Sequence, residues 1–183
     1  MSKPDTLDSI INANLESLAQ GEELVRSLTD KEYQYKASPL LNSSIGEHFR
    51  HIADTYFALM QVTASGQVDF NRRRRGALVE SQPEMALAEL RQIRAWLQVL
   101  DPVANEIIQI KTEVALETTR VVELPSSLAR ELIFASSHAV HHYAVIAVIA
   151  KLQNIKIRSN LGIAAATATY ARQSASGIGM AMQ

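Results

Sequence analysis

The chain has 183 residues, with 18 lysines and arginines against 19 aspartates and glutamates, and its formal net charge is −1. Cysteine is absent, which excludes disulfides, thiolate zinc sites, cysteine nucleophiles and iron–sulfur clusters. The neutral balance gives no overall field that would attract nucleic acid or an anionic membrane, so we expect neither as a partner.

Helical periodicity dominates the first hundred residues. Apolar residues recur at helical spacing over residues 5–29, which predicts a first helix. A capping box at Ser44–Glu47, in which a hydroxyl and a carboxylate each bind a free backbone N–H, predicts the start of a second helix. The polar residues 64–80 predict a loop. A second capping box at Ser81–Glu84 then predicts a third helix, whose apolar spacing is typical of a bundle seam.

The periodicity changes after the third helix. Residues 108–114 alternate between apolar and polar, and residues 119–124 are rich in β-branched side chains, which predicts a short β-hairpin. Pro125 then opens a fourth helix. The tail, residues 154–183, is poorly assigned and carries one predicted short helix near 164–172. We therefore expect a single domain over the whole chain (1–183), an all-α four-helix bundle with a β-hairpin inserted before its last helix.

Targeting signals are not apparent in the sequence. The first five residues lack the apolar segment of a signal peptide. The most apolar run, residues 139–150, is shorter than the roughly 20 residues that a membrane span needs. We therefore expect a cytoplasmic protein that does not associate with membranes.

All five histidines lie in two short windows. The first window holds His48 and His51 in the second predicted helix, and the second holds His138, His141 and His142 in the fourth. His138 and His142 are four residues apart, so their imidazoles share one helix face, and a facing helix can supply a third nitrogen. Three neutral nitrogens around a divalent ion leave a position for water or substrate, as in catalytic metal sites. The apolar stripe of the second helix places His48 closer to the core than His51.

The histidines and the nearby Asp54 also have simpler interpretations that involve no metal. Single histidines on apolar faces are usually hydrogen-bonded core residues, but two unpaired imidazoles buried side by side would be costly, which favours the metal site. His141 points away from His142 and has either a hydrogen-bonding role or none. Asp54 lies one turn beyond His51 and either orients an imidazole or is a surface residue. The sequence has neither an HExxH motif nor a Glu-x-x-His pair, which disfavours zincin proteases and di-iron carboxylate bundles.

Two segments carry a family resemblance. Residues 44–54, SIGEHFRHIAD, resemble the second-helix motif of the DinB/YfiT-like metalloenzymes, and residues 138–142, HAVHH, resemble the His-x-x-x-His motif of a later helix in that family. The resemblance covers most of residues 5–155 and leaves the tail uncovered. It implies an antiparallel four-helix bundle with an up-down-down-up course.

The resemblance also implies a metal site and its ligands. A divalent metal, zinc or nickel, would be held by His51, His138 and His142 at one end of the bundle. His48 stays as the alternative ligand from the second helix, or as a hydrogen-bond partner of a ligand.

Relatives of this kind include hydrolases and thiol-dependent S-transferases or isomerases. The resemblance therefore implies a metal-dependent enzyme that acts on a small molecule, anionic or linked to a thiol. The metal would lower the pKa of a bound water or thiol and so supply a nucleophile. The alternative is a protein without catalytic activity, either a metal-binding or stress-response bundle or a dimerising scaffold. A homodimer is an expected assembly in either case.

Four consecutive arginines, Arg72, Arg73, Arg74 and Arg75, lie in the predicted loop. Such a run is usually a solvated loop, but guanidinium groups also suit carboxylate or phosphate, so anion binding near the metal is the alternative. Because His51 lies near the start of the second helix, the loop begins at the far end of the bundle. The family resemblance implies a third helix parallel to the second, so the loop has to run back along the bundle, and this brings the arginines near the metal end.

Overall fold

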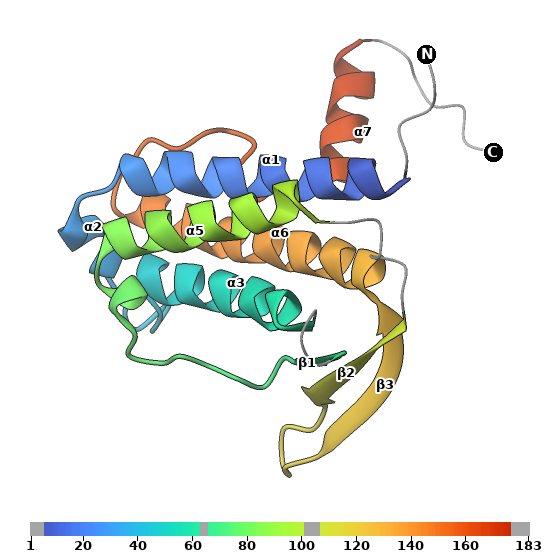
Figure 1. Cartoon of the computed structure of the whole chain (residues 1–183). Coiled ribbons are helices and arrows are strands. Elements are labelled where there is room, and N and C mark those ends of the chain that lie inside the picture. The colour runs from blue at the N-terminus through green and yellow to red at the C-terminus, as the bar shows by residue number, and fades with distance from the viewer. Residues whose placement is uncertain (1–5, 63–65, 101–106, 177–183) are drawn as a thin grey trace.

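The computed structural model describes residues 6–62, 66–100 and 107–176, and four long helices form its body (Figure 1). These helices are α1 (Thr6–Arg26), α3 (Ile45–Met60), α5 (Pro83–Gln98) and α6 (Leu128–Leu152). α1 and α3 each pack against both α5 and α6. Figure 1 shows α3 and α5 running in one direction and α1 and α6 in the other.

A small mixed sheet and three short helices complete the described chain. The short helices are α2 (Asp30–Gln34), the 3-10 helix η1 (Leu78–Glu80) and α7 (Ala165–Ala175). The strands are β1 (Gln67–Asp69), β2 (Ile107–Glu113) and β3 (Val121–Ser127). β2 and β3 form the antiparallel hairpin that the sequence predicts, and β1 pairs parallel to β2.

The added strand corrects the predicted fold. The protein is mostly helical rather than all-α, because residues 67–69, expected to be loop, extend the hairpin into a three-stranded sheet. Val68, the middle residue of β1, is fully buried and gives this strand its place in the core. The rest of the expected loop also contains η1, while residues 63–65 lie outside the described part of the chain.

Helix ends follow local capping chemistry. The capping box at the start of α3 is confirmed: the Ser44 hydroxyl accepts from the Glu47 N–H at 3.2 Å, and the Glu47 carboxylate accepts from the Ser44 N–H at 2.7 Å. A capping box that the sequence analysis missed, Thr29 with Glu32, starts α2 and explains why α1 ends at Arg26 instead of reaching residue 29.

The capping box predicted at Ser81–Glu84 is wrong. The Ser81 hydroxyl instead donates to the Leu78 carbonyl of η1. The residue before α5 is Gln82, whose side chain makes no capping bond, and Pro83 begins the helix because it has no N–H to satisfy.

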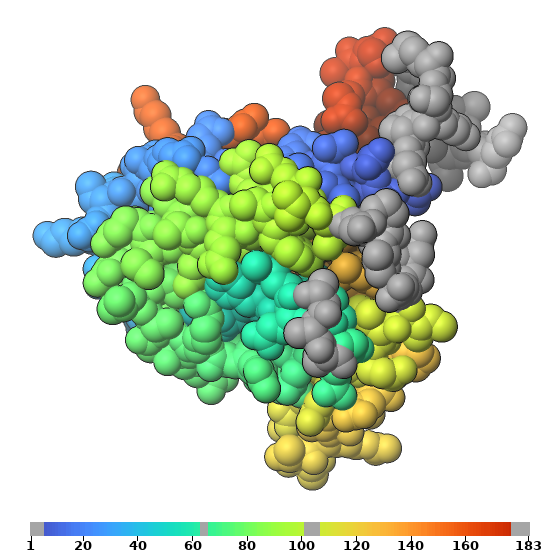
Figure 2. All heavy atoms as spheres, viewed as in Figure 1, coloured from blue at the N-terminus to red at the C-terminus, as the bar shows by residue number. Residues whose placement is uncertain are grey.

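Helix α6 is the apolar helix at the centre of the bundle. By length and composition alone, it is long and apolar enough to cross a membrane. It nevertheless packs against α1 and α3, and its side chains Leu132, Tyr143 and Ile146 are fully buried, as in a core helix. Figure 2 shows the hairpin and α7 projecting from the body of the molecule, and α7 has no buried residue.

Candidate metal centre

The metal-ligand candidates lie where α3 and α6 pack together. The capping box fixes where α3 begins and therefore places His48 and His51, one turn apart, on the face toward α6. Since α6 runs opposite to α3, His138 meets His51, and His142, one turn later on α6, lies between His51 and His48.

Three imidazole nitrogens converge at this interface. The Nε2 atom of His138 lies 3.0 Å from Nε2 of His51 and 3.1 Å from Nε2 of His142. Ligand nitrogens of the three residues all lie within 4.8 Å of one another. Two nitrogens bound tetrahedrally to zinc at 2.0–2.1 Å would be separated by about 3.3 Å. The two separations about His138 are thus already close to the spacing within one tetrahedral coordination shell.

Hydrogen bonds among the three rings cannot pair all of the converging nitrogen atoms. A neutral imidazole nitrogen offers either one N–H or one in-plane lone pair. His138 Nε2 faces two other nitrogens at hydrogen-bonding distance, so a single proton or lone pair on it is directed at two partners. One divalent cation accepts a lone pair from each of the three nitrogens, and a donor set of three imidazoles suits a divalent transition metal.

His48 contacts a candidate ligand instead of completing the cluster. Its Nδ1 lies 2.8 Å from Nδ1 of His142, and its Nε2 lies 2.9 Å from the Ser43 hydroxyl. If Nε2 of His142 is the ligand atom, Nδ1 of His142 carries the proton and donates it to His48, and His48 donates to Ser43. With the ion bound, the chain Ser43–His48–His142 would hold the ring orientation of His142 and accept the proton of its Nδ1 in a hydrogen bond. The role of Ser43 was not predicted from the sequence. The only available signal was a hydroxyl side chain five residues before His48.

The electrostatic environment keeps these rings neutral. Burial, and after it the charges of the neighbouring histidines, lower the pKa of His142 to about 2. Burial lowers the pKa of His51 to about 4, with the charge of Arg73 as the next cause. Burial also lowers the pKa values of His48 and His138. Neutral imidazoles are the form that binds metal, so at neutral pH the histidines need not lose a proton before a cation binds.

Aromatic rings enclose one side of the cluster. The Phe134 ring stacks on His138 with centroids 5.5 Å apart, and Phe70 packs on Phe134 at 5.6 Å. These two residues were also missed in the sequence, where neither stands out from the apolar pattern. The three candidate ligands remain partly exposed, so a small molecule has access to them. His141 is exposed, and its ring lies beside those of His138 and His142.

The arginine loop runs back alongside α3. Arg72 lies beside Gln61 at the end of this helix, and Arg74 lies beside Asp54 in its middle. Arg73 lies between them, close enough for its charge to lower the pKa values of His51 and His138.

Arg74 is a structural residue, not a free cation. It bonds the Asp54 carboxylate at 2.6 Å and forms two bonds to Glu89 of α5, at 2.7 and 2.9 Å. Asp54 is buried and also accepts from Arg50 at 3.2 Å. Both interpretations of Asp54 are therefore wrong: this carboxylate anchors the loop to α3 through arginines, and is neither a histidine partner nor a surface residue.

Comparisons with known proteins identify the family of this chain. The family model of the DinB superfamily matches residues 16–146, which is more than half of the chain. The chain is a member of the DinB superfamily. Among curated proteins, none matches the sequence.

A solved structure is similar in fold to this DinB-superfamily chain. It is described as "YfiT from Bacillus subtilis is a probable metal-dependent hydrolase with an unusual four-helix bundle topology". The similarity has a TM-score of 0.57 at 16% identity, and it covers 85% of this chain and 92% of the other. At this identity the comparison supports the fold alone. The histidine cluster itself fits a divalent metal.

Proposed function

We propose that this DinB-superfamily member is a metal-dependent enzyme with one divalent ion, zinc or nickel, on Nε2 of His51, His138 and His142. The observation that carries the proposal is the convergence of these three nitrogens, with separations of 3.0 and 3.1 Å about His138. Three protein ligands are typical of catalytic sites, whereas structural zinc sites usually use four.

The chain's own residues have distinct tasks in this proposal. When bound, the ion would act as a Lewis acid and make water or a thiol nucleophilic at neutral pH. His48 and Ser43 would then accept and pass on the hydrogen bond from Nδ1 of His142, which leaves its Nε2 free for the ion. Phe134 covers the ring of His138 and excludes water from that side. The exposed side of the cluster is left for the substrate.

Hydrolysis is the favoured reaction, and thiol-dependent S-transfer or isomerisation is the second. The family membership and the similarity to a probable metal-dependent hydrolase support the first. The partial exposure of all three ligands favours an enzyme over a metal-binding or stress-response bundle without activity. A small-molecule substrate, a homodimer and a cytoplasmic location complete the proposal, and light scattering and cell fractionation test the last two.

Metal analysis and activity assays test the proposal together. We expect one divalent ion per purified chain, lost in His142→Ala and retained in the matched variant His141→Ala. The metal-loaded, metal-free and variant proteins are then compared on p-nitrophenyl esters and in a thiol-transfer assay. Turnover that requires the metal and His142 supports the enzyme. Full metal occupancy with no turnover in either assay supports the non-catalytic alternative.

A further inference from the structure

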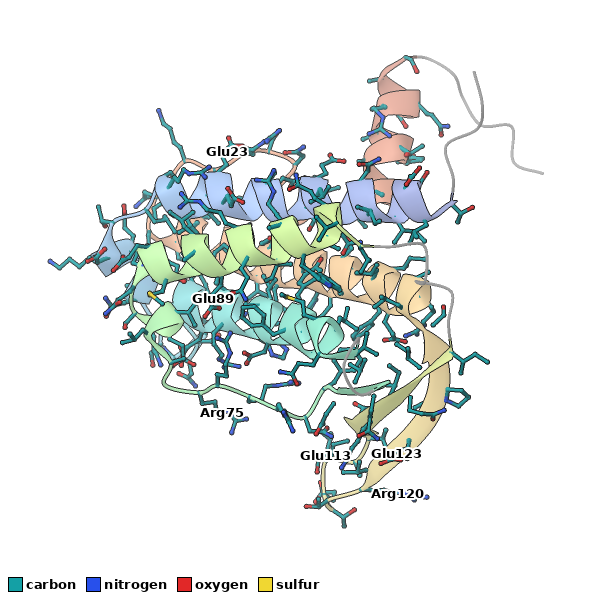
Figure 3. All side chains as sticks on the ribbon, viewed as in Figure 1. Glu23, Arg75, Glu89, Glu113, Arg120 and Glu123 are labelled. Carbon is teal, nitrogen blue, oxygen red and sulfur yellow. The ribbon has the colours of Figure 1, made fainter. Side chains whose placement is uncertain are left out.

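A cavity of about 420 Å³ opens between the arginine loop and the start of the hairpin turn. Its walls include Phe70, Arg73 and Arg75 from the loop, and Thr112 and Glu113 from the end of β2. Figure 3 shows Arg75 on the loop that passes α3, with Glu113 on the hairpin. Two arginines and one glutamate leave these walls with a formal charge of +1.

Arg73 and Arg75 differ from the other two arginines of the run. Arg74 is held by Asp54 and Glu89, and Arg72 lies 3.9 Å from the Asp69 carboxylate. Across the described ranges of the chain, no carboxylate forms an ion pair with Arg73 or Arg75. Nη1 of Arg73 donates to the backbone carbonyls of Phe70 and Arg72, which fixes the side chain without neutralising it.

The charge of Arg75 also acts on the guanidinium group of Arg73. Burial lowers the pKa of Arg73, the carboxylates of Asp54 and Asp69 raise it, and the charges of Arg50 and Arg75 lower it. Neighbouring cations that are not neutralised by protein carboxylates are stabilised by an anion that binds between them. Guanidinium groups match the planar oxygens of carboxylate and phosphate especially well.

A row of packed aromatic rings leads from this cavity to the metal centre. Phe70, which lines the cavity, packs on Phe134, and Phe134 stacks on His138. The cavity and the histidine cluster therefore lie at the two ends of this row of rings, and a molecule that reaches both would place its charged group between Arg73 and Arg75.

We propose that Arg73 and Arg75 bind the carboxylate or phosphate group of the substrate in this cavity, and that its reacting bond lies at the metal centre. The inference rests on the proposed function and specifies the substrate class as small oxyanion-bearing molecules. Arg72 and Arg74, which have carboxylate neighbours, take no part.

Titration of the full-length, metal-free protein with inorganic phosphate, followed by amide NMR shifts at constant ionic strength, tests the site. We expect saturable shifts in the loop and at the end of β2. Charge-assisted hydrogen bonds contribute enough that Arg73→Ala with Arg75→Ala should weaken the association at least about tenfold. The matched variant Arg72→Ala should change it less than about twofold. Equal association in the double variant and the wild type overturns the proposal.

Further titrations distinguish a preference for phosphate from one for carboxylate. They also distinguish binding at this cavity from binding at the metal site. Benzoate and acetate replace phosphate in parallel titrations, and the tighter of benzoate and phosphate identifies the preferred oxyanion. His142→Ala should lose zinc yet bind phosphate as the metal-free wild type does. If wild-type protein binds phosphate through the two arginines but no zinc, the proposed function fails while the anion site stands. Zinc binding at the three histidines that is retained in the double arginine variant excludes a general loss of structure.

Discussion

Replacing His48 by phenylalanine tests whether the chain Ser43–His48–His142 supports the metal centre. The substitution keeps a ring of similar size but removes the nitrogen that lies 2.8 Å from Nδ1 of His142. It therefore leaves the three candidate ligands in place while the N–H of His142 loses its acceptor. Removing such a partner typically costs 10- to 100-fold in metal affinity, about 1.4–2.7 kcal/mol. A lost hydrogen bond with a donor left unsatisfied accounts for about the same free energy.

Zinc affinity measured at neutral pH by competition with a chelating dye gives the result directly. We expect the zinc dissociation constant of His48→Phe to rise by about one to two orders of magnitude. His141→Phe, a change of the same type at an exposed neighbour on α6, should leave it within about threefold. Ser43→Ala, at the far end of the chain of hydrogen bonds, should have a smaller effect than His48→Phe. Wild-type affinity in His48→Phe, or the same loss in His141→Phe, would refute the role of His48.

Three further predictions concern stability. Because the pKa of His51 is about 4 in the folded chain and 6.5 in an exposed imidazole, the unfolded chain gains its proton first as the pH falls. The free energy of unfolding of the metal-free protein should therefore decrease from about pH 6.5 down to about pH 4 in urea titrations, and less so in His51→Gln; identical slopes would contradict this. In Gly46→Ala, a Cβ would collide with the backbone carbonyl oxygen of Glu80, so we expect a loss of about 1–3 kcal/mol in chemical denaturation. Asp54→Ala removes the buried partner of Arg74 and should cost about 3 kcal/mol, with faster proteolysis of the loop; a wild-type denaturation midpoint would contradict it.

The sequence predicts the long helices well because their signals are local. The capping box at Ser44 determines where α3 begins, and i,i+4 spacing places His138 and His142 on one face of α6. Both signals depend only on residues within one turn. The same logic failed at Ser81, where the hydroxyl bonds the preceding η1 turn, a feature that the helical pattern does not contain.

The choice between His48 and His51 could not be made from residue periodicity. Both residues lie one turn apart on the same face of α3, and the position of α6 along this face decides which of them meets His138. That position is set by packing between distant segments. The family motif indicated His51, and the structure places its Nε2 in the cluster while His48 bonds the far side of His142.

The ion pairs of the arginine run also could not be predicted from residues close in the sequence. Asp54 and Arg74 are 20 residues apart, and Glu89 lies 15 residues further on. Only the return of the loop along α3 brings them together. The sequence therefore predicted a basic loop with two alternative roles, but not which arginines are neutralised by carboxylates and which remain free.

A crystal structure of the protein grown with zinc, with anomalous scattering measured at the zinc edge, tests the central claim most directly. We predict one zinc ion per chain, bound by Nε2 of His51, His138 and His142 at about 2.0–2.1 Å, with His48 bonded to Nδ1 of His142. Zinc bound elsewhere, zinc bound by His48 in place of His51, or no zinc at the three histidines would contradict the account.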